Sequence, residues 1–581
     1  MQLNDNFLEK LIDENIITFA DYEIYKWIYK LYSSNITALI ALLVNYKLRN
    51  GDSCLLIDEI EKKDLAEILF YESSLDLKLP DKQKIVDELA KSGLIGNANS
   101  LCHLDEKNRL FFKRIYSYEK NVANKLKQLA SIKTFFNNSN TKQSPGKNWQ
   151  DVAIQMAKIN QLLVISGGPG TGKTTTVKKI IKNLLMENEK LNIILSAPTG
   201  KAVSRLQESL KDDEISEKIN PPVTIHKLLG ANYTLTRFYY NDKNKLPYDV
   251  IIVDEVSMVN LELMHQLLIS IKDDAKLILL GDKDQLSSVE AGAIMGEICS
   301  FPEIYPQINT INSFSKEYGK KLYIPDENLV NIDNPLIDCT IEFTKNYRFK
   351  EDSGIGLLSN AIKNNNFTLI ENIISKKISF DDLILIEKPS NTLFDEIVDD
   401  YYNNLKDDLL STLTAVKILT PYRITPFGSE KLNEIIDKKL RKKFLTSQTW
   451  YTGRQVIITV NDYQNELFNG DIGICMKKDN KEYIAFLRTG DENYKYLHPS
   501  LLPAYDLAFA MTVHKSQGSE FDKVYFFIGQ KESDLLNREL IYTAITRARK
   551  KIIIIGNKDL LFNSLMKKTT RKSALSDMLY R

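Results

Sequence analysis

The stretch "GGPGTGKTTT", residues 167–176, constrains the fold of this chain more than any other stretch. It follows the apolar run "LLVIS" (162–166), precedes a helical pattern and fits GxxxxGK[ST]. Glycines let a backbone wrap around phosphate groups, and free N–H groups at the start of the following helix bind anionic oxygens. A strand, a phosphate-binding loop and a helix in this order predict an α/β unit that binds a nucleoside triphosphate.

The loop also predicts individual contacts. Lys173 can reach the β- and γ-phosphates, and the Thr174 hydroxyl can bind Mg²⁺. A nucleotide and Mg²⁺ are therefore the expected cofactors. The loop residues expected to bind the nucleotide are Gly167, Gly168, Pro169, Gly170, Thr171, Gly172, Lys173, Thr174 and Thr175.

A pair of carboxylates follows the apolar run "VIIV" (250–253). Asp254 is the expected Mg²⁺ ligand, and Glu255 is the expected base for the attacking water. Two adjacent carboxylates at a strand end repel each other unless a divalent cation shares the site, although a solvated Asp–Glu pair is the alternative. Gln285, in "GDKDQLSSVEAGA" (281–293), is expected to hydrogen-bond the γ-phosphate or the attacking water.

Short β-branched runs alternate with helical patterns after residue 160, as in parallel sheets whose strands are buried on both faces. They fall into two sets and predict two successive α/β units. The first set is "LLVIS" (162–166), "NIILS" (192–196), "DVIIV" (249–253) and "KLILL" (276–280). The second set is "AVKILT" (415–420), "QVIITV" (455–460), "KVYFFI" (523–528) and "KIIIIG" (551–556).

Arginines of the second unit are candidates for the nucleotide site of the first. Arg348 lies in "TKNYRF", and Arg547 and Arg549 lie in "LIYTAITRARKK". An arginine placed on the γ-phosphoryl group accelerates its transfer by about 10³–10⁵. Arginines from a second domain act only when the cleft closes, which couples hydrolysis to domain movement. Taken singly, "TRAR" would be a solvated helical face.

In this order, the motifs resemble those of superfamily-1 helicases, and most closely those of the RecD-type alpha subunits of exodeoxyribonuclease V, the motors of RecBCD complexes. The resemblance extends from about Trp149 to the C-terminus. It rests on "NWQDVA", "ISGGPGTGKTTT", "APTGKAVSRL", "TIHKLLGA", "VDEVSM", "GDKDQLSSVEAGA", "NYRF", "SGIG", "PFGSEKLN", "LFNGDIGI", "MTVHKSQGSEF" and "ELIYTAITRARK".

The resemblance implies an α/β fold of two tandem RecA-like P-loop motor domains, parallel sheets with flanking helices, beside a mostly helical N-terminal domain and small inserted β elements. It implies ATP as the nucleotide, with Gln150 reading the adenine edge and Tyr347 stacking on the base. Glu520 is expected to reach toward the ribose, and Gly518 to allow close approach. The residues implied to hold single-stranded DNA are Thr199, Gly200, Lys201, Thr512, His514 and Lys515.

Composition shifts and linker-like segments predict the domain boundaries. The hairpin-like alternation around "NDKN" predicts a protruding β-hairpin at about 231–248, either a wedge for strand separation or a loop without such a role. The expected parts are a helical, partner-docking N-terminal domain (1–115), a linker (116–148), a first motor domain (149–335) and a second motor domain (336–581) with a small β insertion at about 450–505.

Composition argues against several classes of protein. Lys and Arg number 77 against 76 acidic residues, for a net charge of +1, so any basic groove for nucleic acid is local. Five cysteines without a CxxC pair predict buried free thiols in a reducing compartment. The polar N-terminus is no signal peptide, and no apolar run approaches the ~20 residues of a membrane span, so a cytoplasmic protein without membrane contact is expected.

The expected function is an ATP-dependent 5′–3′ single-stranded DNA translocase and helicase, the motor subunit of a RecBCD-type complex that processes DNA ends for recombinational repair. Single-stranded DNA, duplex ends and RecB-like and RecC-like subunits in a heterotrimer are the expected partners. No nuclease centre is visible, so a partner would cut the DNA. Three alternatives stay open: a stand-alone RecD-like helicase, a structural subunit that has lost the motor, and an RNA helicase.

Overall fold

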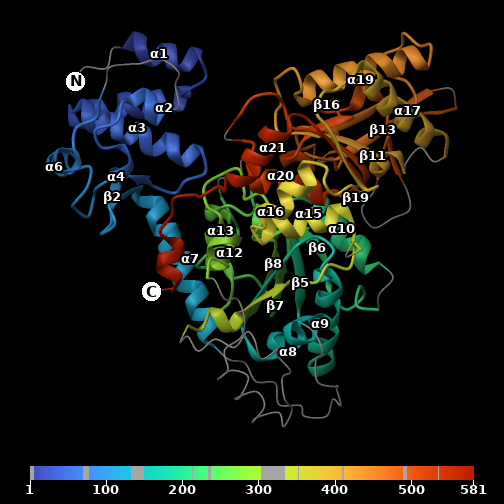
Figure 1. Ribbon diagram of the computed structural model, residues 1–581. Coiled ribbons are helices and arrows are strands. Elements are labelled where there is room, and N and C mark those ends of the chain that lie inside the picture. Colours follow the sequence, from blue (N-terminus) through green and yellow to red (C-terminus); the bar gives the residue numbers. More distant parts are fainter. Residues whose placement is uncertain are drawn as a thin grey trace.

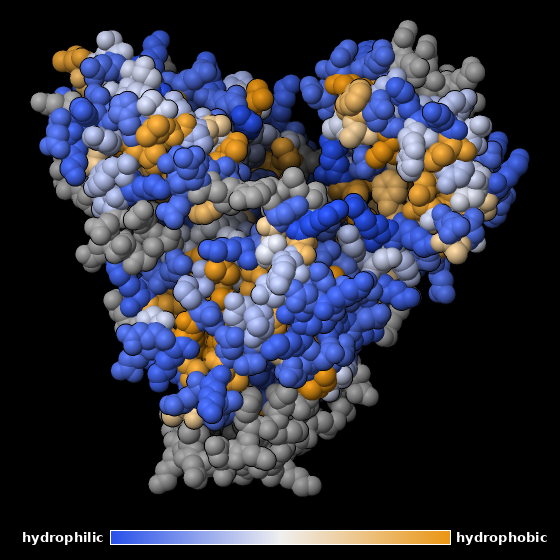
Figure 2. Space-filling model, turned by 180° about the vertical axis from the view of Figure 1, so that it is seen from behind, coloured by the Kyte–Doolittle hydropathy of each residue, from blue (hydrophilic) through white to orange (hydrophobic). Residues whose placement is uncertain are grey.

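The structure is a computed structural model, and its parts are arranged as two lobes above a central α/β unit (Figures 1 and 2). One lobe is the N-terminal domain, and the other is the second α/β unit. The described residues are 5–69, 78–132, 149–211, 214–232, 237–301, 334–350, 352–407, 411–462, 464–479, 481–487, 494–533 and 535–580.

The N-terminal domain is mainly helical, as expected for residues 1–115. Thr18 begins the second helix with a reciprocal capping box to Asp21, and Ser34 caps the third. A three-stranded antiparallel sheet of order β1-β3-β2 was not expected. The elements are α1 (Asp5–Asp13), α2 (Phe19–Tyr32), α3 (Asn35–Arg49), β1 (Leu55–Leu56), α4 (Ile57–Ile60), α5 (Leu65–Ile68), α6 (Lys82–Ser92), β2 (Cys102–Leu104) and β3 (Arg109–Phe112).

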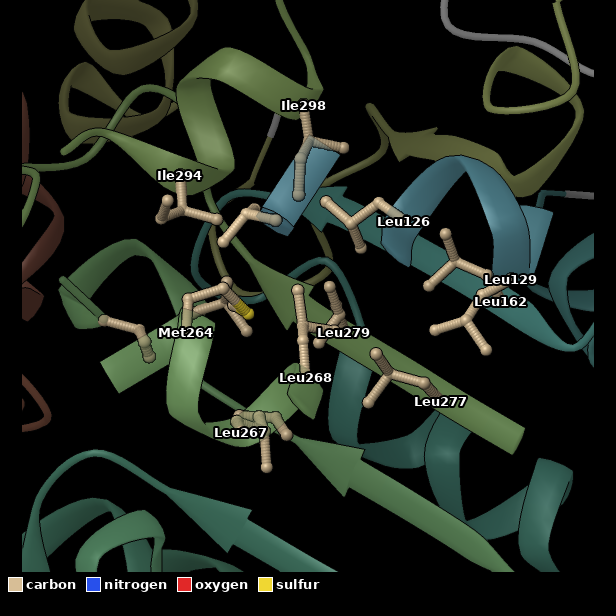
Figure 3. Close-up of a cluster of buried hydrophobic side chains, with 14 of the residues drawn as sticks. Leu126, Leu129, Leu162, Met264, Leu267, Leu268, Leu277, Leu279, Ile294 and Ile298 are labelled. Atoms are coloured by element: carbon tan, nitrogen blue, oxygen red, sulfur yellow. The ribbon is translucent and has the colours of Figure 1, made fainter. Parts of the chain in front are cut away.

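The linker predicted at 116–148 is wrong over its first part, which belongs to helix α7 (Lys113–Ser131). Leu126 and Leu129 of this helix are buried and point toward Leu162 of the first sheet (Figure 3). Buried apolar residues recur along α7 at helical spacing, so it packs on the α/β unit instead of spanning a gap. Residues 133–148 of the predicted linker lie outside the described residues.

The first α/β unit is a six-stranded parallel sheet of order β6-β5-β7-β8-β4-β9. Alternation along β4 supplies both of its cores, since Leu162 joins the cluster on α7 and α12, and Leu163 joins the cluster on α8 and α9. The elements are α8 (Trp149–Ile159), β4 (Leu162–Gly167), α9 (Lys173–Glu187), β5 (Ile193–Ala197), α10 (Gly200–Leu210), β6 (Asn220–Thr224), α11 (Ile225–Leu228), β7 (Val250–Val253), α12 (Leu261–Ser270), β8 (Lys276–Gly281), α13 (Ile294–Ile298) and β9 (Thr340–Phe343).

The expected boundary between residues 335 and 336 is wrong. Strand β9 lies beyond that boundary, yet it pairs in parallel with β4, with Val164 opposite Thr340. The first sheet therefore ends after Phe343. The loop of residues 344–350 then begins directly beside the phosphate-binding loop.

The second α/β unit is a five-stranded parallel sheet of order β10-β19-β18-β11-β17. Two parallel units in succession match the expected fold class. The elements of this unit are α15 (Gly354–Lys363), α16 (Phe367–Ile374), β10 (Leu383–Ile386), α17 (Asn391–Asp407), α18 (Thr412–Ala415), β11 (Val416–Thr420), α19 (Ser429–Lys443), β17 (Ala510–Thr512), β18 (Phe521–Phe527), α20 (Arg538–Thr546), β19 (Ala548–Ile555) and α21 (Lys558–Met566), and the C-terminal segment that follows them carries α22 (Leu575–Tyr580).

One strand predicted for this sheet lies elsewhere. The run "QVIITV" forms β12 (Gln455–Ile458), which pairs antiparallel with both of its neighbours in a separate sheet of order β15-β14-β13-β12-β16. A short apolar run does not reveal which sheet it joins. The other strands are β13 (Ile472–Lys478), β14 (Lys481–Leu487), β15 (Tyr494–Leu497) and β16 (Tyr505–Leu507), so this sheet occupies the segment expected to hold a β insertion.

The hairpin predicted around "NDKN" is not formed by the described residues. The antiparallel bridge in this region joins Ala231 to Phe238, both before "NDKN", and residues 233–236 lie outside the described part. Asn241 Oδ1 instead accepts the backbone N–H groups of Lys243 and Asn244 in a local turn. Leu246 then returns to the core, so 241–248 is held against the first unit.

The C-terminal segment leaves the second unit after α21 and returns to the first. Helix α22 packs against α7, and its Leu575 and Leu579 are buried in the core of the first unit. Figure 1 shows this last helix beside α7, far from the sheet it follows in sequence. Among the described residues, no helix combines the length and the apolar character needed to cross a membrane.

Candidate functional site: a nucleotide cleft between two α/β units

The phosphate-binding loop connects β4 to α9, as predicted. Gly170 and Gly172 have φ of 79° and 83°, values that favour glycine. A Cβ atom on Gly170 would lie 2.5 Å from Cβ of Arg348, so this position also needs glycine for close approach. Lys173 begins α9, and its ammonium donates to the carbonyl oxygens of Gly167 and Gly168. Residues 346–348 therefore pack directly against the phosphate-binding loop.

The carboxylate pair lies at the end of β7, next to the loop. Glu255 adopts a left-handed conformation with φ of 55°, an uncommon one that clusters at functional sites. Its backbone N–H donates to Asp254 Oδ1 at 2.8 Å. Burial, and then the charge of Glu255, raise the pKa of Asp254 to about 6, against the opposing charge of Lys173. A carboxylate oxygen at the end of β7, close to the charge of Lys173 in the loop, is the kind of ligand that a hard cation such as Mg²⁺ prefers.

Gln285 and Arg547 meet across the two units. Arg547 is almost fully buried, and its Nη2 donates to Gln285 Oε1 at 2.8 Å. Its Nη1 donates to the carbonyl oxygen of Ser519 at 3.1 Å. The predicted arginine of the second unit therefore reaches the predicted glutamine of the first. Arg549 instead pairs with Asp522 at 2.7 Å on the surface.

The two residues expected at the adenine are adjacent. Gln150 Nε2 donates to the Thr171 carbonyl oxygen at 3.1 Å and to the Tyr347 hydroxyl at 3.2 Å. The Tyr347 ring is 55% exposed, and its backbone N–H donates to the Gly170 carbonyl oxygen at 2.8 Å. An exposed ring anchored to the loop is able to stack on a base.

Glu520 is held by two arginines. Its Oε1 lies 2.5 Å from Nη2 of Arg205 and 2.8 Å from Nη2 of Arg348. Burial alone would raise the pKa of Glu520, but the charges of Arg205 and Arg348 hold it at about 2. The carboxylate is therefore a fixed negative charge between helix α10 and the loop of Arg348.

The segments expected to hold DNA come together at the start of α10. Thr199 caps this helix by accepting the Ala202 N–H at 3.2 Å. A Cβ atom on Gly518 would lie 3.9 Å from Thr199 Oγ1, so this glycine packs beside the cap. Phe468 of the β insertion lies against Gly200 on another side. The start of α10, the loop of Gly518 and the β insertion thus lie side by side.

The remaining predicted DNA contacts differ in accessibility. Thr512 and His514 are partly exposed, and exposed Lys515 pairs with Asp506 of the insertion at 3.1 Å. Lys201 is the exception, because its buried ammonium has no hydrogen-bond partner. Burial lowers the pKa of Lys201 to about 8, although the charge of Asp471 opposes the shift. The structure does not bring the Lys201 ammonium to the surface that Thr199 and Gly200 occupy.

Three residues of the cleft were not predicted. Arg205 holds Glu520, and the Tyr542 hydroxyl lies 3.2 Å from Oδ2 of Asp282. Each lies inside a motif recognised in the sequence, namely "APTGKAVSRL", "ELIYTAITRARK" and "GDKDQLSSVEAGA". Their membership of these motifs was the signal by which the sequence could have identified them.

All five cysteines are buried and free, which confirms the expectation of buried free thiols.

Comparison with protein families gives two matches that follow these two units. A model described as an AAA domain matches residues 150–291, and a UvrD-like helicase C-terminal domain matches residues 507–555. The first match contains the phosphate-binding loop and the carboxylate pair. The second contains Glu520 and Arg547.

Several named proteins are similar to the chain. RecBCD enzyme subunit RecD of Haemophilus influenzae is 30% identical, over 98% of this chain and 99% of the relative. The protein of the same name from Buchnera aphidicola subsp. Acyrthosiphon pisum is 30% identical, over 97% and 99%. The ATP-dependent RecD2 DNA helicase of Deinococcus radiodurans is 28% identical, over 68% of this chain and 47% of the relative. A crystal structure of the Bacteroides Pif1 helicase with ADP-AlF3 and ssDNA is 18% identical, over 71% and 92%, with a TM-score of 0.34.

Proposed function

Because the chain belongs to the RecD family and is an ATP-dependent DNA helicase, we propose that it is the motor subunit of a RecBCD-type exodeoxyribonuclease V. In this role it moves 5′ to 3′ along one strand and unwinds double-strand DNA ends for recombinational repair. RecB-like and RecC-like subunits are its proposed partners, in the cytoplasm.

The observation that carries the motor function is the bond between Arg547 and Gln285. It places a buried guanidinium of the second unit on a residue at the end of the first sheet. An arginine supplied across a cleft stabilises γ-phosphoryl transfer only while the two units are together. Hydrolysis would then alternate with separation of the units, as a translocating motor requires.

The nucleotide site follows from the same cleft. Lys173 and the loop N–H groups would hold the phosphates, Thr174 and Asp254 would hold Mg²⁺, and Glu255 would take a proton from water. Bound Mg²⁺ would supply charge stabilisation for the phosphates. Gln150 and Tyr347 would hold the adenine. Arg348, which packs on Gly170, would reach the phosphates from the second unit's side.

The strand would lie at the start of α10, between the two units and the β insertion. Thr199 and Gly200 would meet the backbone on one side, and Thr512, His514 and Lys515 on the other. Hydroxyl groups, backbone N–H groups and cations bind phosphates without reading sequence. Phe468 adds an aromatic wall, which suits base stacking of about 1–3 kcal/mol.

Partner docking would use the N-terminal domain. Phe19, Trp27 and Leu31 of α2 have exposed fractions of 65%, 53% and 52%. Exposed large apolar residues on one helix are typical of an interface. If the holoenzyme cuts DNA, a partner would carry that centre, since no cluster of three metal-binding side chains occurs among the described residues.

Replacement of Lys173 tests the motor function. Lys173→Ala should abolish the ATPase activity that single-stranded DNA stimulates, because no other ammonium reaches the loop carbonyls in the described structure. Lys179→Ala, an exposed position on the same helix, is the matched control. Unchanged activity in Lys173→Ala would contradict the proposal. Comparison of DNA with RNA as the stimulating strand distinguishes a DNA motor from an RNA helicase.

Size-exclusion chromatography of the chain together with the proteins that co-purify with it tests the proposed heterotrimer. Co-elution with RecB-like and RecC-like subunits supports the complex. A monomer that unwinds duplexes alone supports the stand-alone alternative instead. The match covers 99% of the RecD relative and 47% of the RecD2 relative.

A further inference from the structure

Helix α10 connects the proposed strand site to the nucleotide cleft. Its first turn carries Thr199 and Gly200, and Arg205 lies on the next turn. Arg205 extends from this helix to Glu520, and the two side chains form an ion pair of 2.5 Å. Because Glu520 belongs to the second unit, this pair joins the two units directly.

The same carboxylate oxygen also holds Arg348, at 2.8 Å. Arg348 packs on Gly170 of the phosphate-binding loop, and its neighbour Tyr347 donates a backbone hydrogen bond to that glycine. One chain of contacts therefore runs from the loop through Arg348, Glu520 and Arg205 to α10. Every contact in it is an ion pair, a hydrogen bond or close packing.

Because the shared carboxylate of Glu520 is largely buried, the stability of its charge depends on its two arginine partners. The side chain of Glu520 is 14% exposed, and those of Arg348 and Arg205 are 22% and 39% exposed. A carboxylate so far removed from water needs a cation, so loss of one arginine strengthens its hold on the other. A guanidinium also has a rigid planar fork, which transmits a shift of its helix more directly than a lysine would.

We propose that Arg205 is a positioning residue that couples strand binding to the nucleotide site. It rests on the proposed motor function. When a nucleotide phosphate attracts Arg348, Glu520 relies on Arg205 alone, and the stronger pair draws α10 toward the second unit. The start of α10, with Thr199 and Gly200, moves with it. By linkage, strand binding changes nucleotide affinity by the same factor as the nucleotide changes strand affinity.

The coupling factor is measurable as the ratio of two dissociation constants. An oligodeoxythymidylate is titrated with and without a non-hydrolysable ATP analogue, and typical coupling factors are about 5–150. In Arg205→Gln, we expect this ratio to fall to within about twofold of 1, and in Arg205→Lys to be partly restored. Arg549→Gln is the matched control, since Arg549 also forms an ion pair, at 2.7 Å, and is 40% exposed. A wild-type ratio in Arg205→Gln would overturn the proposal.

A double-mutant cycle tests whether Arg205 acts through Glu520. Arg205→Gln, Glu520→Gln and the double variant should show the same reduced ratio, because they break one pathway. Additive losses would overturn the proposal, since they would mean that Arg205 meets the strand independently. A wild-type protein that binds no strand refutes the motor function and the proposal together. A coupled wild type with an unaffected Arg205→Gln refutes the proposal alone.

Discussion

The hydroxyl of Tyr542 lies 3.2 Å from Oδ2 of Asp282, and both side chains are buried where the two α/β units meet. The same carboxylate oxygen accepts a hydrogen bond from Nε2 of Gln285 at 3.1 Å. Oε1 of Gln285 in turn accepts a hydrogen bond from Nη2 of Arg547. A Cβ atom on Gly168 would lie 2.7 Å from the Tyr542 hydroxyl, so the phenol also lies over the phosphate-binding loop. Tyr542, on helix α20 of the second unit, thus supports Gln285 of the first unit through Asp282.

Removal of this hydroxyl should lower turnover. In Tyr542→Phe, the buried Asp282 carboxylate loses a donor, at a cost of about 1–3 kcal/mol, and Gln285 is less firmly oriented. We expect kcat for strand-stimulated ATP hydrolysis to fall about tenfold or more, with a smaller change in KM for ATP. Tyr525→Phe is the control, because Tyr525 is also buried and bonds a carboxylate, Asp400, away from the cleft. Equal losses of kcat in both variants would contradict the prediction.

Replacement of Gly170 should impair the loop by a clash as well as by backbone strain. Gly170→Ala places a methyl group 2.5 Å from Cβ of Arg348 at a φ of 79°. Gly470→Ala has a comparable φ of 98° but no atom within 4 Å, so it carries the backbone cost alone, about 1–2 kcal/mol. Binding of a fluorescent ATP analogue should be weakened at least about tenfold more by the first change, a further 1.4 kcal/mol. Similar effects of the two variants would refute the role of the clash.

Glu520 should make stability depend on pH. Its pKa is lowered from 4.5 to about 2 in the folded state, so the unfolded chain binds the proton more readily. The stabilisation is therefore fully present above pH 4.5 and is lost as pH falls from 4.5 toward 2, by up to about 3 kcal/mol. Urea unfolding of the wild type and Glu520→Gln should differ most above pH 5 and converge near pH 2. A constant difference across that range would contradict the assignment.

Arg571 should stabilise the return of the C-terminal segment. Its guanidinium donates to the carbonyl oxygens of Ser288, Glu290 and Gly292, which follow Gln285 in the first unit. Arg571→Ala should lower the free energy of unfolding by about 2–3 kcal/mol, because three carbonyl oxygens, two of them in part-buried contacts, lose a charged donor. Arg423→Ala, which breaks an exposed pair with Glu430, should cost less than about 1 kcal/mol. Denaturant midpoints compare the two, and equal shifts would show that the carbonyl contacts contribute little.

Local sequence was a reliable guide wherever the chemistry is local. The loop of residues 167–175, the carboxylates after β7 and the parallel strands on either side follow from glycine conformation, strand ends and β-branched runs, and the structure has them at those positions. Gln150 and Tyr347 were implied by resemblance, and the structure brings them to 3.2 Å.

Predictions that depended on distant pairing were less accurate. The sequence marks "QVIITV" as a strand, but only pairing decides that it joins the antiparallel insertion, because alternation is identical in either sheet. Strand β9 and helix α7 were likewise assigned to the wrong side of a boundary. Their burial depends on partners far along the chain, namely β4 for the strand and α12 and α22 for the helix.

The sequence by itself determined the residue types at each motif and the order of the two α/β units. Only the tertiary structure decided which residues of the two units touch. The contacts Arg547–Gln285, Tyr542–Asp282 and Arg205–Glu520 span from 260 to 315 positions along the chain, and no local periodicity encodes them. The same holds for Lys201, whose motif predicts a contact with DNA but whose ammonium is buried near the charges of Asp471 in the insertion and Arg547 in the second unit.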